Sequence, residues 1–202
     1  MEMWHLKTKD LLDVTGEQLL TFCRNGSALT GHTSHKAPGV EVATGSLVHG
    51  LSMGCGMALA GKREARGWRV FVLLSDGELD EGSNWEPILF APHHRLDNLV
   101  AIVDFNKIQS FGTVKGVLDL DPLADKWRAC GWEVREIDGH DAGQIRAALG
   151  AVPFAAGRPS AIVAHTVKGR GVSFMEDQLL WHYRAPNAEQ LAAALRELET
   201  AP

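Results

Sequence analysis

Acidic and amide side chains follow two apolar runs in the middle of the chain. The run 70–74 leads into Asp76 and Gly77, and the run 99–103 leads into Asn106. If both runs are neighbouring parallel strands, these side chains meet at the carboxyl edge of the sheet, where open α/β sheets bind ligands. Carboxylate and amide oxygens suit a hard cation such as magnesium, which usually carries the phosphates of a substrate or cofactor. The pattern predicts a metal-bridged diphosphate site.

Ordinary turn chemistry is the alternative explanation for these residues. An Asp-Gly pair after a strand is a common turn, and asparagine is common at strand ends. The two ends are joined here by one amphipathic segment with the length of a crossover. That combination favours the site over two unrelated turns.

The segments that must position these side chains alternate between strand and helix patterns. Strands are predicted at 69–75, 99–104, 133–137 and 160–165. Helices are predicted at 8–24, 47–62, 81–95, 122–131, 142–150 and 187–199. This alternation is typical of the α/β class, with an open, mostly parallel sheet and helices on both faces.

The chain length predicts a single domain over residues 1–202. Within it, residues 1–48 are expected to form an N-terminal helix and an active-site loop, and residues 169–202 a C-terminal loop and helix. The net charge of −5 and the absence of a basic cluster give no support for nucleic-acid binding. No stretch is apolar for long enough to span a membrane, and the start lacks a secretory signal. Three cysteines without metal spacing favour a reducing, cytoplasmic location.

Several stretches together resemble a known family. The interval from Asp76-Gly77 to Asn106 resembles the thiamine diphosphate motif, which opens with Gly-Asp-Gly and closes with asparagine. Three further stretches resemble transketolase: PGVEVATGSLVHGLSMGCGMALA at 38–60, EIDGHD at 136–141 and TVKGRGVSFME at 166–176. WHYRAPN at 181–187 resembles the end of split transketolases, whose N-terminal half is a separate polypeptide. The chain therefore resembles the N-terminal, diphosphate-binding subunit of such an enzyme, shortened at its start.

The resemblance implies a set of cofactor and metal residues. Asp76 and Asn106 match side-chain ligands of the metal, and Ile108 matches a ligand through its main-chain carbonyl. The metal would be Mg²⁺, or Ca²⁺ or Mn²⁺ in its position, and two diphosphate oxygens and a water would complete the octahedron. The residues that match positions beside thiamine diphosphate are Gly45, Leu47, Gly77 and Glu78.

The resemblance also implies two active-site histidines and a subunit contact. His32 matches a histidine that faces the substrate, and His182 matches a second one near the diphosphate. Such a ring hydrogen-bonds a substrate hydroxyl or moves a proton near neutral pH. Glu81 matches a carboxylate that couples the two sites of the dimer. The alternatives are a solvated His32, a His182 that packs beside Trp181, and a Glu78 that complements a helix dipole.

Some family features are absent from the sequence. Ser75 stands where the motif has its first glycine, and two histidine-bearing loops of the family have no counterpart here. The glutamate that activates the cofactor lies, in the family, in a separate pyrimidine-binding domain. The resemblance therefore implies a C-terminal partner subunit, an α2β2 heterotetramer, and transfer of a two-carbon ketol unit from a ketose donor to an acceptor.

Two other functions remain open at this point. One is the diphosphate-binding subunit of a 2-oxoacid dehydrogenase-type complex, against which the 181–187 ending argues. The other is a non-catalytic, degenerate subunit kept for assembly. The missing histidine loops favour that reading, and the retained Asp76, Asn106 and His182 oppose it.

Overall fold

The computed structural model describes residues 15–32, 34–37, 42–43 and 45–200. The chain forms two compact units, Met1–His49 and Gly50–Pro202, and each is described by itself. The first unit contains α1 (Gly16–Leu19), whose N-terminus is capped by the side chain of Thr15. Turns follow this helix in the described part of the unit. The one-domain assignment made from the sequence stays a prediction.

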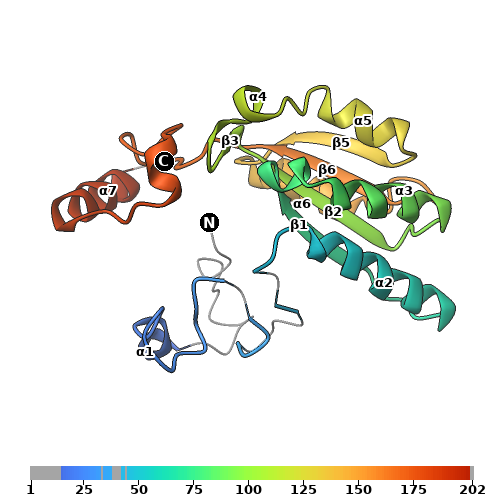
Figure 1. Ribbon diagram of the computed structural model, residues 1–202, viewed down its shortest axis with the longest axis horizontal. Helices are drawn as coiled ribbons and strands as arrows, with labels where there is room; N and C mark the ends of the chain where they lie inside the picture. Colours follow the sequence, from blue (N-terminus) through green and yellow to red (C-terminus); the bar gives the residue numbers. More distant parts are fainter. Residues whose placement is uncertain (1–14, 33, 38–41, 44, 201–202) are drawn as a thin grey trace. The chain divides into compact units, whose positions relative to one another are not determined.

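A four-stranded parallel sheet forms the centre of the second unit (Figure 1). Its strands lie in the order β1 (Val70–Ser75), β2 (Leu99–Phe105), β6 (Ser160–His165) and β5 (Glu133–Asp138). All three pairings are parallel. The α/β fold with a parallel sheet is therefore confirmed.

Helices cover both faces of this sheet and bury different parts of it. On one face, α2 (His49–Arg63), α3 (Trp85–His93) and α5 (Leu123–Ala129) bury the main core. On the other face, α6 (Ala142–Gly150) packs against the middle of the sheet in a smaller core. Parallel strands need cover on both sides, because βαβ crossovers put helices on both faces.

Short elements surround the carboxyl edge of the sheet. They are η2 (Gly77–Asp80), η3 (Gly82–Asn84), the hairpin of β3 (Ile108–Gln109) and β4 (Gly112–Thr113), α4 (Val114–Val117), and η4 (Leu179–His182). The chain then continues into α7 (Ala188–Thr200). The sequence pattern predicted neither the hairpin nor η4, because two to four residues are too few for a period to appear.

Two predicted helices differ from the structure by more than two residues at one end. The helix predicted over 81–95 begins at Trp85. Local hydrogen bonds from side chains fix the turns before it, because the Asn84 side chain donates to the carbonyl of Glu78 (2.6 Å) and the Trp85 indole to that of Leu79 (3.1 Å). The helix ends at His93, and Arg95 beyond it has a φ of 52°.

The helix predicted over 8–24 is the second case. It ends at Leu19, and its first residues, 8–14, lie outside the described part of the chain. Cys23 has a φ of 55°, a conformation that no helix contains, and its amide donates to the carbonyl of Leu29 (2.8 Å). The chain therefore turns back where the apolar pattern predicted another turn of helix.

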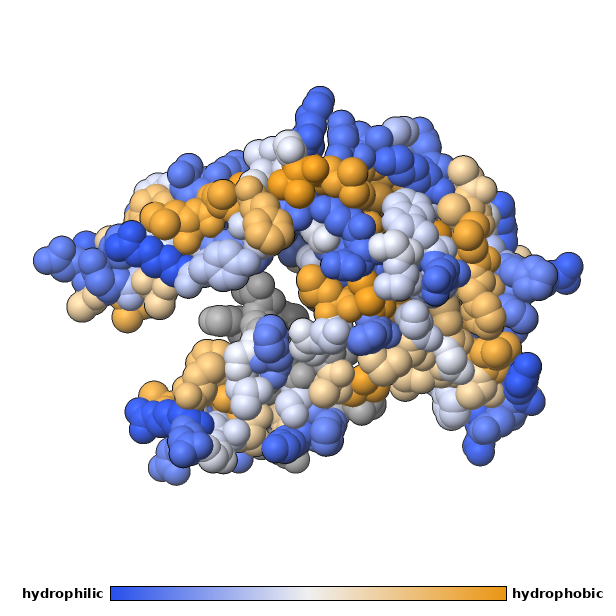
Figure 2. All heavy atoms as spheres, viewed as in Figure 1, coloured by the Kyte–Doolittle hydropathy of each residue, from blue (hydrophilic) through white to orange (hydrophobic). Residues whose placement is uncertain are grey.

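Hydrophobic side chains also remain at the surface (orange in Figure 2). No helix within the described ranges is long and apolar enough to cross a membrane. The exposed apolar residues therefore call for an explanation in terms of other contacts.

A proline inside α3 creates a constraint on the core. Pro92 has no N–H to donate to the carbonyl of Ile88, four residues earlier, and so one helical hydrogen bond is missing. The indole N–H of the buried Trp132 donates to that carbonyl instead, at 2.8 Å. Trp127 stacks edge-on against Trp132, with ring centroids 4.7 Å apart.

Trp132→Phe should lower the free energy of unfolding by about 1–3 kcal/mol, because it leaves the buried carbonyl of Ile88 without a donor. Chemical denaturation followed by circular dichroism measures this loss. Trp68→Phe is the matched control, since Trp68 is about half exposed and should change stability by no more than about 0.5 kcal/mol. Equal stability of Trp132→Phe and the native chain would show that Trp132 does not satisfy this carbonyl.

Candidate functional site

Asp76 lies where β1 ends, and its carboxylate joins two chain segments. One oxygen accepts the amide of Gly77 at 2.7 Å, and the other accepts the amide of Lys107, beyond the end of β2, at 2.5 Å. The parallel register makes this contact possible, because Ser75 lies opposite Asp104. The two predicted strand ends therefore lie side by side.

Asn106 and Ile108 follow the end of β2 on the same edge. The amide of Ile108 donates to the side-chain oxygen of Asn106 at 3.0 Å, which fixes the turn between β2 and β3. Both residues are buried. Lys107, between them, has a φ of 69°, so the chain reverses at this point. The structure thus brings Asp76, Asn106 and Ile108 to one end of neighbouring strands.

Gly77 lies in close contact with the β3 hairpin. A Cβ atom at position 77 would lie 2.8 Å from the Cβ of Gln109, which is too close for any side chain. The Gln109 amide donates in turn to Asp80 at 2.8 Å. Packing therefore requires glycine here, independently of any diphosphate. The buried Glu78 accepts the amide of Ser75 at 3.3 Å, so it also fixes the turn after β1.

A second carboxylate lies next to Asp76. The main-chain carbonyl of Asp104 accepts the amide of Asp76 at 3.3 Å. Its side chain accepts a hydrogen bond from the hydroxyl of Thr166, at the end of β6. Asp104 and Thr166 therefore connect the site to the third strand along the sheet.

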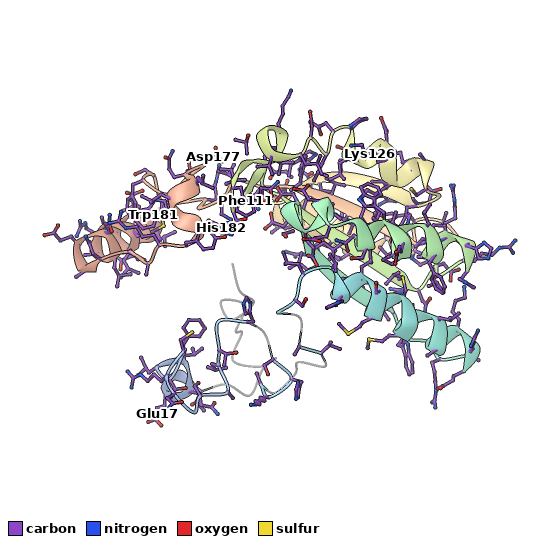
Figure 3. All side chains as sticks on the ribbon, in the orientation of Figure 1. Glu17, Phe111, Lys126, Asp177, Trp181 and His182 are labelled. Carbon is purple, nitrogen blue, oxygen red and sulfur yellow. The ribbon has the colours of Figure 1, made fainter. Side chains whose placement is uncertain are left out.

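The C-terminal segment supplies a histidine and a lysine. Figure 3 shows His182 and Trp181 on the segment that precedes α7. The Trp181 indole donates to the carbonyl of Phe174 at 2.8 Å, and η4 lies against β3, the strand that contains Ile108. His182 stacks edge-on against Tyr183, not Trp181, with ring centroids 4.6 Å apart. The element that contains His182 is thus next to the hairpin of the site.

Burial and nearby charges shift the pKa values of Asp76 and His182. Burial raises the pKa of Asp76, and the two amide donors only partly oppose that effect. Burial also lowers the pKa of His182, and the positive charge of Lys168 lowers it further. Lys168 acts on Asp76 as well, where its charge favours the carboxylate. The imidazole therefore remains neutral to lower pH than an ordinary histidine.

The site fits a divalent cation on its own chemistry. Asp76 is 1% exposed, its hydrogen-bond partners are main-chain amides, and no lysine or arginine of the described residues pairs with it. The pKa of this buried carboxylate stays raised despite the charge of Lys168, and a bound cation would supply the further positive charge that stabilises the ionised form.

The predicted ligand set is unlike a histidine or cysteine cluster. The described residues contain no group of three or more His, Cys, Asp and Glu side chains that could hold a metal ion. A carboxylate, an amide oxygen and a main-chain carbonyl are instead the all-oxygen donors that Mg²⁺ and Ca²⁺ prefer. The assignment of Asp76, Asn106 and Ile108 stays a prediction that the geometry favours.

Three predicted residues belong to the first unit. A Cβ atom on Gly45 would lie 3.1 Å from the Cβ of His32, so these two residues pack together. Leu47 is exposed. In the second unit, the predicted contact residue Glu81 is exposed too, at the junction of η2 and η3. The roles of His32, Gly45, Leu47 and Glu81 stay predictions.

Sequence reasoning missed Lys168 and Gln109 as members of the site. Lys168 lies in a glycine-rich loop, where a solvated lysine is the ordinary expectation. Gln109 follows the metal-ligand stretch and offers no pattern of its own. The contact between Gln109 and Gly77 could not be found from the sequence, because other glycines of this chain without a positive φ, such as Gly56 and Gly82, have no close neighbour.

A protein-family comparison covers nearly the whole chain. The family model described as transketolase, thiamine diphosphate binding domain, matches residues 1–201. An apulose-4-phosphate transketolase subunit of Phocaeicola vulgatus is 42% identical over 173 residues, which are 86% of this chain and 62% of that protein. The 6-deoxy-6-sulfo-D-fructose transketolase subunit SqwG of a Clostridium species is 41% identical over 184 residues, 91% of this chain and 67% of that one. The chain thus spans about two thirds of these relatives or less.

Solved structures show the same likeness. Transketolase from Campylobacter jejuni superposes with a TM-score of 0.84 at 30% identity, over 91% of this chain and 30% of that one. Transketolase from Leishmania mexicana superposes with a TM-score of 0.75 at 25% identity, over 93% of this chain and 33% of that one.

Lys168→Met should raise the pKa of His182, because it removes a positive charge that disfavours the imidazolium. Titration of the His182 ring protons by NMR measures the shift. Lys126→Met is the control, since Figure 3 shows Lys126 on α5, far along the sheet from His182, and Lys126 donates to the carbonyl of Leu120 (2.9 Å). An unchanged or lowered pKa in Lys168→Met would contradict this account of the charges.

Proposed function

Because this chain belongs to the family of transketolase thiamine diphosphate-binding domains, we propose that it is the diphosphate-binding subunit of a split transketolase-like transferase. The observation that carries the proposal is the buried carboxylate of Asp76, which lies beside Asn106 and Ile108 at the carboxyl edge of the sheet. The names of the relatives support a split enzyme, since three of them are named as single subunits of a transketolase.

In the proposed enzyme, Asp76, Asn106 and the carbonyl of Ile108 would hold Mg²⁺, which would supply positive charge for the diphosphate of thiamine diphosphate. When bound, thiamine diphosphate would supply a nucleophilic carbon for transfer of a two-carbon ketol unit. Gly77 and Glu78 shape the turn against the diphosphate, and they do so through the contacts to Gln109 and Ser75. The chain's own part is therefore to bind and orient the cofactor.

The proposed proton chemistry belongs to the two histidines. A His182 ring that is neutral at pH 7 can accept a proton from a substrate hydroxyl or hydrogen-bond to it. Burial and, to a lesser extent, the charge of Lys168 favour that neutral form, and Lys168 would add positive charge beside the anionic cofactor. His32, packed on Gly45, is proposed to face the substrate.

A partner subunit is part of the proposal. It would bring the pyrimidine-binding domain with the glutamate that activates the cofactor, in an α2β2 heterotetramer coupled through Glu81. The exposure of Glu81 supports a contact across chains. The substrates would be a ketose donor and an aldehyde or related acceptor. Free thiols at Cys23, Cys55 and Cys130 support a cytoplasmic location.

The relatives also bear on the two alternative functions. Subunits named as transketolases match at 41–43% identity, which favours ketol transfer over a 2-oxoacid dehydrogenase role. A chain kept for assembly alone would have no need of a buried carboxylate with a raised pKa at Asp76. Cofactor binding therefore separates the transferase from the assembly role.

Asp76→Ala should weaken Mg²⁺-dependent binding of thiamine diphosphate by more than about 100-fold, because loss of a direct ligand exceeds the cost of losing an outer contact. Calorimetry of the assembled complex, with and without Mg²⁺, measures it. Asp138→Ala is the matched control, an exposed carboxylate at the carboxyl end of β5, and should stay within about threefold of the native chain.

A second variant separates loss of the metal ligand from misfolding as the cause of weaker binding. Asp76→Asn keeps the size of the side chain and removes the charge, and circular dichroism reports whether either variant stays folded. Native-like cofactor affinity in a folded Asp76→Asn or Asp76→Ala protein would overturn the metal assignment.

The isolated chain should show no ketol transfer, and activity should appear when it is mixed with its pyrimidine-domain partner chain. The assay uses thiamine diphosphate, Mg²⁺ and ketose phosphates, with apulose 4-phosphate among them. The physical reason is that residues 1–201 match the thiamine diphosphate binding domain, whereas the activating glutamate is proposed to lie in the pyrimidine-binding domain. Full ketol transfer by the chain alone would contradict the proposal that two chains form the active site together.

A further inference from the structure

Two separate turns contain the proposed metal ligands. The first turn, residues 76–80, follows β1 and begins with Asp76. The second turn, residues 106–109, follows β2 and contains Asn106 and Ile108. Mg²⁺ demands a near-octahedral set of ligands at about 2.0–2.1 Å, so ligands from two turns serve it only at one separation. The contacts that hold the two turns relative to each other therefore bear on which cation the site accepts.

One link between the turns uses a proposed ligand. The amide of Lys107 donates to one carboxylate oxygen of Asp76 at 2.5 Å, and the amide of Gly77 donates to the other at 2.7 Å. A bound cation would draw on the same two oxygens, so this link would change when the site is filled. A spacing that stays fixed needs a link made by other side chains.

The side chains of Gln109 and Asp80 form such a link. The amide nitrogen of Gln109, at the end of the second turn, donates to Oδ2 of Asp80, at the end of the first, at 2.8 Å. Gln109 is 8% exposed. The other oxygen of Asp80, Oδ1, is buried and has no hydrogen-bond partner within the described ranges. The carboxylate of Asp80 is thus directed at Gln109 alone in that part of the chain.

Packing against Gly77 sets the opposite limit on the spacing. A Cβ atom at position 77 would lie 2.8 Å from the Cβ of Gln109, so the two turns approach as closely as a glycine allows. This contact limits how near the turns can come. The hydrogen bond from Gln109 to Asp80 limits how far they can separate.

We propose that Gln109 is a positioning residue for the metal site, which holds the second turn at a fixed distance from Asp76 through Asp80 and Gly77. The inference rests on the proposed function, because the residue acts toward the Mg²⁺ that this function requires. It adds a cause of cation selectivity to that function. A fixed spacing favours Mg²⁺, whereas Ca²⁺ accepts longer bonds of about 2.3–2.6 Å in flexible geometry.

A purely structural role for the pair has a different consequence. If the hydrogen bond between Gln109 and Asp80 only stabilised the fold, its loss would affect Mg²⁺ and Ca²⁺ binding alike. If the bond sets the spacing of the ligands, its loss affects Mg²⁺ much more than Ca²⁺. The ratio of the two affinities therefore separates the two roles.

Gln109→Glu should weaken Mg²⁺ binding about 10-fold to 100-fold, the usual cost of losing an outer contact to a metal ligand. The variant keeps the length of the side chain and sets two carboxylates against each other at Asp80. Ca²⁺ binding should change by less than about threefold, because Ca²⁺ tolerates a wider site. Calorimetric titration of the assembled complex and thiamine diphosphate with each cation measures both affinities. The added negative charge attracts either cation, so it cannot cause a loss that is confined to Mg²⁺.

The double variant Asp80→Asn with Gln109→Glu should restore Mg²⁺ binding to within about threefold of the native chain. It rebuilds the hydrogen bond with donor and acceptor exchanged, since the amide at position 80 donates to the carboxylate at position 109. The net charge of the pair is native, and the buried atom without a partner is again an oxygen. Gln109→Met has a similar length and no amide, and gives the same cation comparison if Gln109→Glu does not fold.

Gln144→Glu is the matched control, because it makes the same exchange in a second pair of glutamine and aspartate. The Gln144 amide donates to Asp141 at 2.9 Å at the start of α6, which follows β5 at the other edge of the sheet from β1. Its affinities for Mg²⁺ and Ca²⁺ should both stay within about threefold of the native values.

Hydrogen exchange of the Lys107 amide reads the link without metal or cofactor. In the metal-free chain, exchange should be about 10-fold faster in Gln109→Glu and native-like in the double variant, because the second turn is freed and then held again.

The outcomes separate this inference from the proposed function. Native Mg²⁺ affinity in Gln109→Glu, equal losses for Mg²⁺ and Ca²⁺, or no recovery in the double variant would overturn the positioning role while the native complex still binds Mg²⁺. Native-like exchange of the Lys107 amide in Gln109→Glu would overturn it as well. A native complex that binds no Mg²⁺ with thiamine diphosphate would overturn the proposed function, and the positioning role with it.

Discussion

The hydrogen bonds of one buried carboxylate hold the site together. Asp76 ends β1 and accepts the amides of Gly77 and Lys107, so it fastens the first strand to the turn beyond the second. That turn positions Asn106 and starts the hairpin against which Gly77 packs. Each of these contacts requires that β1 and β2 run parallel and in register. The chemistry of the site therefore depends on the parallel topology of the sheet.

Burying this ionised carboxylate costs free energy unless a cation lies close to it. Burial raises its pKa, and the neighbouring Asp104 adds negative charge. A fold retains such a group where a ligand compensates it. The side-chain amide of Asn106 and the carbonyl of Ile108 are neutral oxygen donors, which suits a cation that brings its own anion. This electrostatic balance gives the family resemblance a physical reason in this chain.

The sequence predicted the parts of the site that follow from strand ends. Apolar runs located β1 and β2, and Asp76 and Asn106 then had to meet because parallel strands share a carboxyl edge. It did not predict Lys168, because its loop owes its path to tertiary contacts. Nor did it predict that α3 begins at Trp85, since side-chain hydrogen bonds from Asn84 and Trp85 to main-chain carbonyls six residues earlier override helix propensity there. The hydrophobic periodicity of the sequence carries no information about the position of Lys168 or about the start of α3.

Lys168 has a consequence for how the site responds to its surroundings. Its charge acts on Asp76 and on His182 alike, so the carboxylate and the imidazole share one electrostatic neighbour. A change in the charge of Lys168 therefore shifts the pKa of the carboxylate and the pKa of the imidazole in the same direction. One loop residue thus influences the proton affinity of both the proposed metal ligand and the proposed base.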